Sequence, residues 1–229
     1  GLGDVYKRQN TFSDDTLKFD GNSISKDEPK GKIICKRATT LHTEKCTQTD
    51  DSMFCSGAGY TTSGSKGTST ITYGNLGTSG TLTTGDSFDC DVNGDGEYNP
   101  GTERFYYVSD YYNTSTKAFE DDTAVLLYYN NVSAGNPSNS ATYAYDSSGE
   151  NWHGPRTAIT QLPTTSQWSN VSLKNKIRSI LSENNENTTK GGILPSNYSY
   201  EGYVARLLTL QEINNACSCL LYTSDAADE

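Results

Sequence analysis

The chain has 229 residues, a formal net charge of −10 and 33% hydrophobic residues. This length allows one domain with its own core, or a domain with an extension. An acidic chain without Lys or Arg clusters argues against nucleic acid and anionic membranes as partners. No apolar run approaches the roughly 20 residues of a membrane-spanning helix.

Both ends look foreign to the fold. Residues 1–9 (GLGDVYKRQ) and 219–229 (CLLYTSDAADE) resemble translated sequencing adapters, so we expect a fragment that is open at each end. Without these tags, 16 of the 18 basic and 24 of the 28 acidic residues remain, and the formal net charge is −8. The cysteine count falls from 6 to 5, so Cys217 and Cys219 do not form a metal or redox motif.

Residues 10–69 are predicted to form a polar, cysteine-containing extension. We expect residues 10–32, which are polar and acidic with little periodicity, to form an extended lead-in and residues 33–35 to form a short strand. Residues 39–69, rich in Ser, Thr and Gly, are expected to be loops held by disulfides.

Four of the remaining cysteines lie close together in this polar part of the chain: Cys35, Cys46, Cys55 and Cys90. This usage is typical of disulfides in an oxidising compartment, although three pairings are possible. A zinc site is the alternative, but the spacings fit no known ribbon or finger. Cys217 is left over, and we expect its partner to lie beyond the fragment.

The middle of the chain predicts short antiparallel strands. Residues 70–73 and 81–83 alternate apolar and polar side chains. Residues 104–109 and 124–129 predict a hairpin joined by a polar connection over residues 110–122. Residues 130–154 read as loop.

An acidic loop precedes this hairpin. Asp91, Asn93 and Asp95 occupy positions 1, 3 and 5 of a D-x-N-x-D-G pattern, with Gly96 supplying the sharp turn at position 6. Glu97 at position 7 would offer its carbonyl oxygen, and Asn99 could serve at position 9. Position 12 is Thr102 instead of the usual bidentate acid, which follows one residue later as Glu103. The loop therefore predicts a calcium site or, alternatively, an Asx-rich turn that binds nothing.

The last part of the chain predicts helices. Thr164 and Gln167 form a capping-box pattern ahead of apolar residues at near-helical spacing, which predicts a helix over residues 165–182. Residues 183–192 break it. Residues 203–208 predict a strand that leads into a second capping box, Thr209 with Glu212, and a helix that ends at about Cys217.

The segment ARLLTLQEI at residues 205–213 resembles the R-L-P-T-x-x-E-W segment of C-type-lectin-like domains, including those of formylglycine-generating enzymes. LPTTSQW at residues 162–168 is similar to the same segment, in which a strand leads into a helix. CKRATTLHTE at 35–44 and ERFYYVSD at 103–110 resemble uncharacterised secreted or surface proteins of gut Firmicutes. The resemblance implies an α+β, lectin-like domain over residues 70–218 that is cut short after its second helix. It implies no activity, because this fold carries enzymes, adhesins and receptors alike.

No catalytic motif stands out. The two histidines, His42 and His153, lack a metal-ligand neighbour at helical spacing, there is no G-x-S-x-G, and no two carboxylates suggest a glycosidase pair. We therefore expect a non-catalytic, secreted or cell-surface module that binds an extracellular glycan or protein, with calcium as its candidate cofactor. The alternatives are a fragment of an enzyme whose catalytic residues lie past Cys217, and a structural, pilin-like surface subunit.

Overall fold

The structure of the protein is a computed structural model. It describes residues 10–11, 16–19, 24–25, 33–46, 69–113, 115–129, 132–133, 136–140, 144–149, 153–171, 173, 176–179 and 197–217. Over these residues, antiparallel strands dominate and two short helices accompany them. This composition is consistent with the small α+β fold predicted from the sequence.

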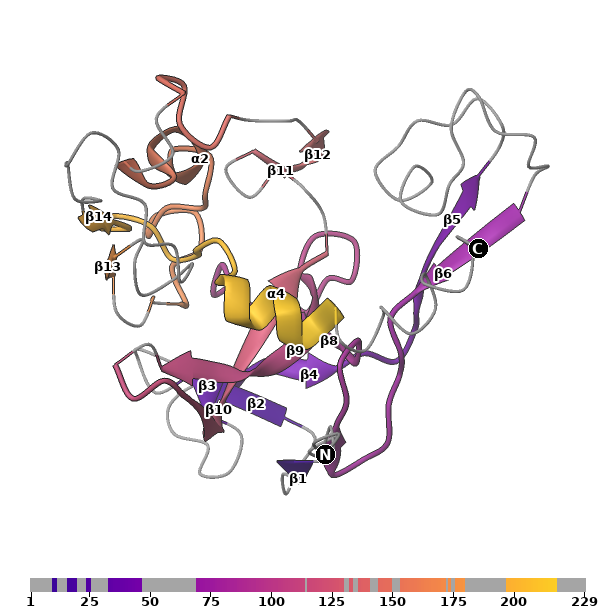
Figure 1. Ribbon diagram of the computed structural model, residues 1–229. Coiled ribbons are helices and arrows are strands. Elements are labelled where there is room, and N and C mark those ends of the chain that lie inside the picture. The colour runs from indigo at the N-terminus through magenta and orange to yellow at the C-terminus, as the bar shows by residue number, and fades with distance from the viewer. Residues whose placement is uncertain are drawn as a thin grey trace, which may run out of the picture.

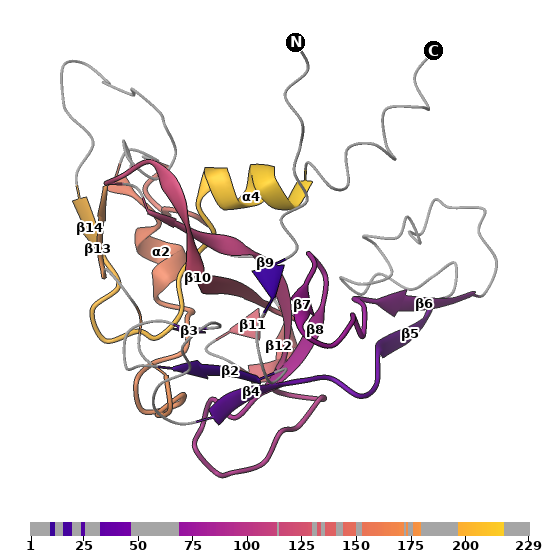
Figure 2. The same ribbon diagram turned by 90° about the horizontal axis from the view of Figure 1, so that it is seen from below.

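Six antiparallel strands form the centre of the molecule and close on themselves, because β10 pairs with β9 on one side and β3 on the other (Figures 1 and 2). The strands follow one another around the ring as β10 (Ala118–Tyr128), β3 (Ile24–Ser25), β2 (Thr16–Phe19), β4 (Ile33–Arg37), β8 (Ser87–Cys90) and β9 (Arg104–Asn113). Strand β4 is confirmed. The expected extended lead-in over residues 10–32 contains β2 and β3, which supply two members of this ring.

One disulfide links two neighbouring strands of the ring. Cys35 of β4 faces Cys90 of β8 in the strand register, and their sulfur atoms are bonded. Cys46 is also disulfide-bonded, to a cysteine whose side chain lies outside the described residues. The predicted use of cysteines as disulfides is thus confirmed for Cys35 and Cys90, while Cys55 is outside the description.

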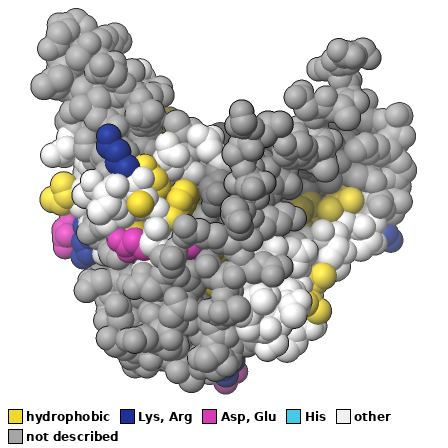
Figure 3. Space-filling model, turned by 60° about the horizontal axis from the view of Figure 1, so that its bottom comes forward, with side chains coloured by type: hydrophobic (Ala, Val, Ile, Leu, Met, Phe, Trp, Pro, Cys, Tyr) yellow, Lys and Arg dark blue, Asp and Glu magenta, His cyan; other side chains and the backbone are white. Residues whose placement is uncertain are grey.

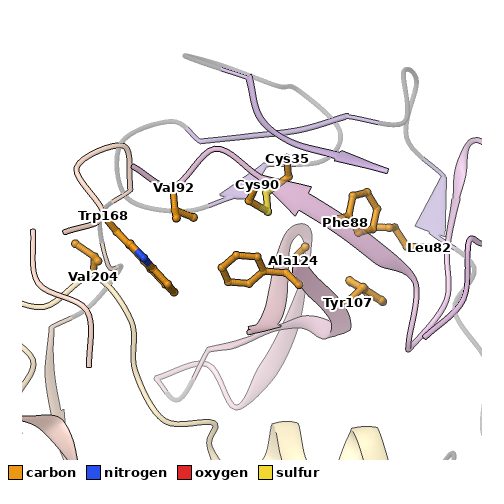
Figure 4. Close-up of a cluster of buried hydrophobic side chains, with 10 residues drawn as sticks. Cys35, Leu82, Phe88, Cys90, Val92, Tyr107, Ala124, Trp168 and Val204 are labelled. Carbon is orange, nitrogen blue, oxygen red and sulfur yellow. A yellow bond between two sulfur atoms is a disulfide. The ribbon is translucent and has the colours of Figure 1, made fainter. Parts of the chain in front are cut away.

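The inner faces of these strands hold the main core (Figure 4). Successive residues of a strand point to opposite faces, so Phe88 and Cys90 of β8 lie on the same side as Phe105 and Tyr107 of β9, with which they share a buried cluster. Trp168 arrives from a distant part of the chain and closes one end, with its ring centroid 5.7 Å from that of Phe105.

The β9–β10 hairpin is confirmed and is longer than predicted. Pairing continues to Asn113 and Ala118, so the predicted polar connection over residues 110–122 shrinks to the few residues between these two positions. Cross-strand contacts explain the extension: Tyr112 and Phe119 pack edge to face at 5.1 Å, and Asn113 donates a 2.7 Å hydrogen bond to Glu120. Such pairs stabilise polar strands as well as apolar ones.

The two short strands predicted around residues 74–80 are confirmed, and each pairs with an earlier segment. β6 (Ser69–Tyr73) pairs with β5 (His42–Cys46), so residues 42–46, which were expected to be loop, form a strand. The β5–β6 pair projects away from the closed sheet in both views (Figures 1 and 2). β7 (Thr81–Leu82) joins β1 (Asn10–Thr11).

β11 (Val132–Ser133) and β12 (Asn136–Ser140) form a further pair, and α2 (Arg156–Ile159) is one helical turn. The expectation of loop throughout residues 130–154 is therefore wrong for residues 132–133 and 136–140.

The helix predicted over residues 165–182 is wrong. Gln167 does accept a 3.0 Å hydrogen bond from the Thr164 backbone N–H, as a capping box requires, and Trp168 N–H returns to Thr164 O. The turn stops there because Asn170 N–H bonds to Val92 O in the acidic loop. Further on, β13 (Ile177–Ser179) pairs with β14 (Asn197–Ser199). The predicted break at residues 183–192 lies outside the described residues.

The predicted strand over residues 203–208 is also wrong. Tyr203 makes an isolated bridge with Thr164, and the rest of the segment has no strand partner. Instead, Leu208 packs against the buried cluster of Val108, Tyr111 and Val125. This packing uses the apolar side chains of the segment without a sheet.

The final predicted helix is confirmed as α4 (Leu210–Cys217), which lies over β9 (Figure 1). Thr209 N–H donates to Glu212 Oε2 at 2.9 Å, and Glu212 N–H donates to Thr209 Oγ1 at 3.2 Å, which is a complete capping box. Glu212 is fully buried and is held by a two-pronged ion pair with Arg206.

The surface offers no continuous apolar face among the described side chains. The exposed large hydrophobic residues come from separate segments, and on the face shown in Figure 3 hydrophobic atoms form separate small patches. They are Leu76, Leu127, Ile177 and Ile213. No described helix is long and apolar enough to cross a membrane.

Candidate metal centre

The acidic loop occupies residues 91–103, between the end of β8 and the start of β9. Both flanking strands belong to the closed sheet, and the Cys35–Cys90 disulfide lies directly before the loop. The loop therefore starts and ends at fixed points.

Asp91 turns inward and organises the first half of the loop. It is 6% exposed, and its two carboxylate oxygens accept hydrogen bonds from Gly94 N at 2.7 Å and Gly96 N at 3.1 Å. Both glycines have positive φ, +79° and +85°, a conformation that other residues rarely adopt. The glycine predicted at position 6 is thus required by the backbone.

Asn93 and Asp95 are exposed and form the outer edge of the loop. Asn93 Oδ1 accepts from Asp95 N at 3.0 Å, and Asp95 Oδ1 accepts from Glu97 N at 2.8 Å. Asn93 Nδ2 also donates to Asp95 Oδ2 at 2.9 Å. These Asx contacts aim successive side-chain oxygens along one side of the loop.

Glu103 closes the loop from the other end. It is 3% exposed, and its oxygens accept hydrogen bonds from Val92 N at 3.3 Å and Asn99 N at 2.9 Å. Burial raises the pKa of this carboxyl, while the two backbone hydrogen bonds lower it and the negative charges of Asp95 and Asp91 raise it further. Removing water from the carboxylate is the largest of these effects.

The structure brings three of the five predicted ligands together. One carboxylate oxygen each from Asp91, Asp95 and Glu103 lies within 4.8 Å of the others. Two oxygens bound to one Ca²⁺ at 2.3–2.6 Å are at most about 5 Å apart, so this separation fits a shared ion. The side chain of Glu97 is exposed and lies outside this group, and Thr102 is exposed while Glu103 is buried.

No described basic side chain forms an ion pair with this cluster, although Lys36 Nζ lies 3.9 Å from the centre of the Tyr98 ring in the same loop. Arg104 is the adjacent cation, but its Nε bonds to Asp89 Oδ1 at 2.7 Å, and no ion pair in the described part of the chain reaches Asp91, Asp95 or Glu103. Two buried carboxylates near a third one repel each other, and such an arrangement favours a bound cation.

Residues far away in the sequence hold the loop in place, and these were not predicted. Asn170 Nδ2 donates to Asp91 O at 2.9 Å, and Ser169 Oγ donates to Asn93 O at 2.7 Å. On the other side, the hydroxyls of Tyr128 and Tyr129 donate to Thr102 O at 2.9 Å and Gly101 O at 2.7 Å. No local pattern signals these contacts, because Asn170 and Asp91 are separated by 79 residues.

The two histidines lie elsewhere, each beside an acid. His42 Nε2 is 2.9 Å from Glu44 Oε1, and His153 Nδ1 is 2.9 Å from Asp146 Oδ2. Neither histidine belongs to a described group of three metal-ligating side chains.

No protein family, curated protein or solved structure matches the chain.

Proposed function

We propose that the chain is a non-catalytic, secreted or cell-surface binding module whose loop at residues 91–103 holds one calcium ion. The observation that carries this proposal is the convergence of Asp91, Asp95 and Glu103 within 4.8 Å without a described basic partner. All the candidate side-chain ligands are oxygens, which suits a hard cation such as Ca²⁺ and does not suit Zn²⁺.

The three carboxylates would contact the ion from different sides. Asp91 and Glu103, both buried, would hold the ion from the inner side, and the exposed Asp95 would close it from the solvent side. Asn93 Oδ1 could complete the outer edge. The backbone N–H groups already bonded to these carboxylates leave further lone pairs on each oxygen for a cation.

The extracellular location is supported by cysteine usage. Cys35, Cys46 and Cys90 are disulfide-bonded, as is typical of proteins that work in oxidising compartments. The lectin-like interpretation and an extracellular glycan or protein ligand rest on the resemblance of residues 205–213, whose capping box is present.

Calorimetric titration of the oxidised protein with calcium tests the proposal. We expect one saturable site with a Kd of about 10⁻⁴–10⁻³ M, the usual range for extracellular modules. Asp91→Asn with Asp95→Asn should abolish binding, whereas Glu97→Gln is the matched control and should bind as the parent does. Absence of binding at 10 mM calcium would refute the metal site.

Binding should also stabilise the fold. At calcium concentrations of about 10 to 100 times Kd, mass action adds about 1.4–2.7 kcal/mol to the free energy of unfolding. The unfolding midpoint of the Glu97→Gln control should rise with calcium, and that of the double variant should not.

A further inference from the structure

Cys90 is bonded directly to both ends of the acidic loop at residues 91–103. Asp91 follows it in the chain, and the Cys90 N–H donates to Glu103 O at 3.0 Å. Cys90 O in turn accepts from Val92 N–H at 2.8 Å. The two buried carboxylates of the loop, Asp91 and Glu103, are therefore brought together through one residue.

Strand β4 holds Cys90 from the other side. The disulfide with Cys35 is the register pair at the end of the β4–β8 ladder, next to the loop. Lys36, the following residue of β4, also reaches the loop, but only through its Nζ, 3.9 Å from the centre of the Tyr98 ring. The disulfide thus ties the start of the loop covalently to a second strand.

The disulfide lies in the packed core, so its loss cannot be absorbed in place. Cys35 is 0% and Cys90 2% exposed, and both belong to the same buried cluster as the loop residue Val92 (Figure 4). Two thiol sulfurs cannot remain at bonding distance and move apart to van der Waals contact. A close-packed interior transmits such a displacement to its neighbours. Because Asp91 lies between Cys90 and Val92 in the chain, the displacement reaches the first carboxylate of the loop.

We propose that the Cys35–Cys90 disulfide is a redox switch for the acidic loop, which keeps its closed, cation-binding geometry only in the oxidised protein. A dithiol supplies two electrons and two protons, the S–S bond breaks to give two thiols, and the dithiol itself becomes a disulfide. Asp91 and Glu103 are then no longer held together through Cys90, and the loop opens.

The use of this switch rests on the proposed calcium site, which would assemble only after the chain reaches an oxidising compartment. Coupling between two sites is reciprocal, so calcium makes the disulfide harder to reduce by the same factor by which the disulfide strengthens calcium binding. Such couplings are typically about 5–150-fold, and we expect a factor of about 10 here.

The first test is amide hydrogen exchange in EDTA, which follows the loop without calcium. The Asp91 carboxylate accepts hydrogen bonds from the amides of Gly94 and Gly96, so the protection of these amides reports the closed loop. In Cys35→Ala with Cys90→Ala, their protection should fall about tenfold relative to the oxidised parent.

Glu212→Ala is the matched control for this test. It is expected to destabilise the fold by a similar amount, but it leaves the disulfide in place, so the amides of Gly94 and Gly96 should exchange as in the parent. Equal protection in the cysteine variant and the parent would overturn the switch. An equal fall in both variants would also overturn it, because the effect would then follow global stability.

The second test uses the unmodified chain, so it does not depend on the folding of a variant. In a buffer of reduced and oxidised dithiothreitol, alkylation and mass spectrometry measure the thiol fraction of each cysteine at equilibrium. Saturating calcium should lower the equilibrium constant for reduction of Cys35–Cys90 about tenfold and leave the disulfide of Cys46 unchanged. The calcium effect should disappear in Asp91→Asn with Asp95→Asn.

The outcomes separate the switch from the calcium site. Equal reduction of Cys35–Cys90 with and without calcium, in a parent that binds calcium by calorimetry, would overturn the switch and leave the site standing. A parent that binds no calcium would refute the site alone, and the exchange of the Gly94 and Gly96 amides would then decide the switch.

Discussion

Asn170→Ala should loosen the acidic loop from the segment that replaces the predicted helix. The change removes the 2.9 Å hydrogen bond from Asn170 Nδ2 to Asp91 O and the 3.5 Å contact with Asp91 Oδ2. It keeps the backbone bond from Asn170 N–H to Val92 O. A single such hydrogen bond contributes about 1 kcal/mol, and the loss approaches about 3 kcal/mol if Asp91 O stays dry.

The assay is urea unfolding followed by tryptophan fluorescence, because Trp168 lies two residues before Asn170 and packs in the core (Figure 4). For a chain of this size, 1 kcal/mol corresponds to about 2–4 °C in Tm. Asn197→Ala, an exposed position in β14, is the matched control and should unfold as the parent does. A stability of Asn170→Ala equal to that of this control would refute the reasoning that the Asn170 side chain anchors the acidic loop.

Three further predictions follow from buried contacts. Glu212→Ala should cost about 3–5 kcal/mol in urea unfolding, because the Arg206 side chain, only 9% exposed, loses the carboxylate of fully buried Glu212; an effect below 1 kcal/mol would contradict this ion pair. Removing the Cys35–Cys90 disulfide, which joins residues 55 apart, should cost about 4 kcal/mol, measured against the oxidised parent with the other cysteines intact; equal stability would exclude a structural role. Glu103→Gln in EDTA should be less destabilising at neutral pH than near pH 4. The hydrogen bond lost where an amide nitrogen replaces one acceptor oxygen is common to both pH values. A carboxyl whose pKa is raised on folding stabilises most below its unfolded pKa and loses this contribution as pH rises through the folded value, so an effect equal at both pH values would be inconsistent with the raised pKa.

The sequence predicted well where local pattern and tertiary pairing agree. The β9–β10 hairpin, β4, β6 and α4 follow from alternation, from β-branched and aromatic residues, or from a capping box whose two hydrogen bonds both form. In each of these elements, the residues that carry the pattern also make the contacts that the pattern predicts.

Predictions failed where a backbone N–H or C=O group bonds to a residue far away in the sequence instead of to a local one. Thr164 and Gln167 begin a helical turn, but the N–H of Asn170 bonds to the acidic loop 78 residues earlier, at Val92. Likewise, residues 16–19 (TLKF) and 24–25 (IS) are short segments in a polar, acidic stretch, and they become strands because the sheet closes through them. Hydrogen bonds across such sequence separations leave no local signature.

The candidate site was predicted in part. The D-x-N-x-D-G pattern identified Asp91 and Asp95, and Glu103 was noted as one residue late for an ordinary loop. The structure brings Glu103 into the cluster because a turn at residues 99–102 replaces the helix that usually follows, with Glu103 N–H bonded to Asn99 O. The side chain of Glu97 stays outside the cluster, and the supporting residues Ser169 and Asn170 could not be found from spacing.

A crystal structure of the oxidised protein in saturating calcium, with the ion identified by its anomalous signal, tests the central claim most directly. The account predicts one Ca²⁺ at 2.3–2.6 Å from carboxylate oxygens of Asp91, Asp95 and Glu103. A loop that binds no ion under these conditions, or an ion held without these three carboxylates, would contradict it.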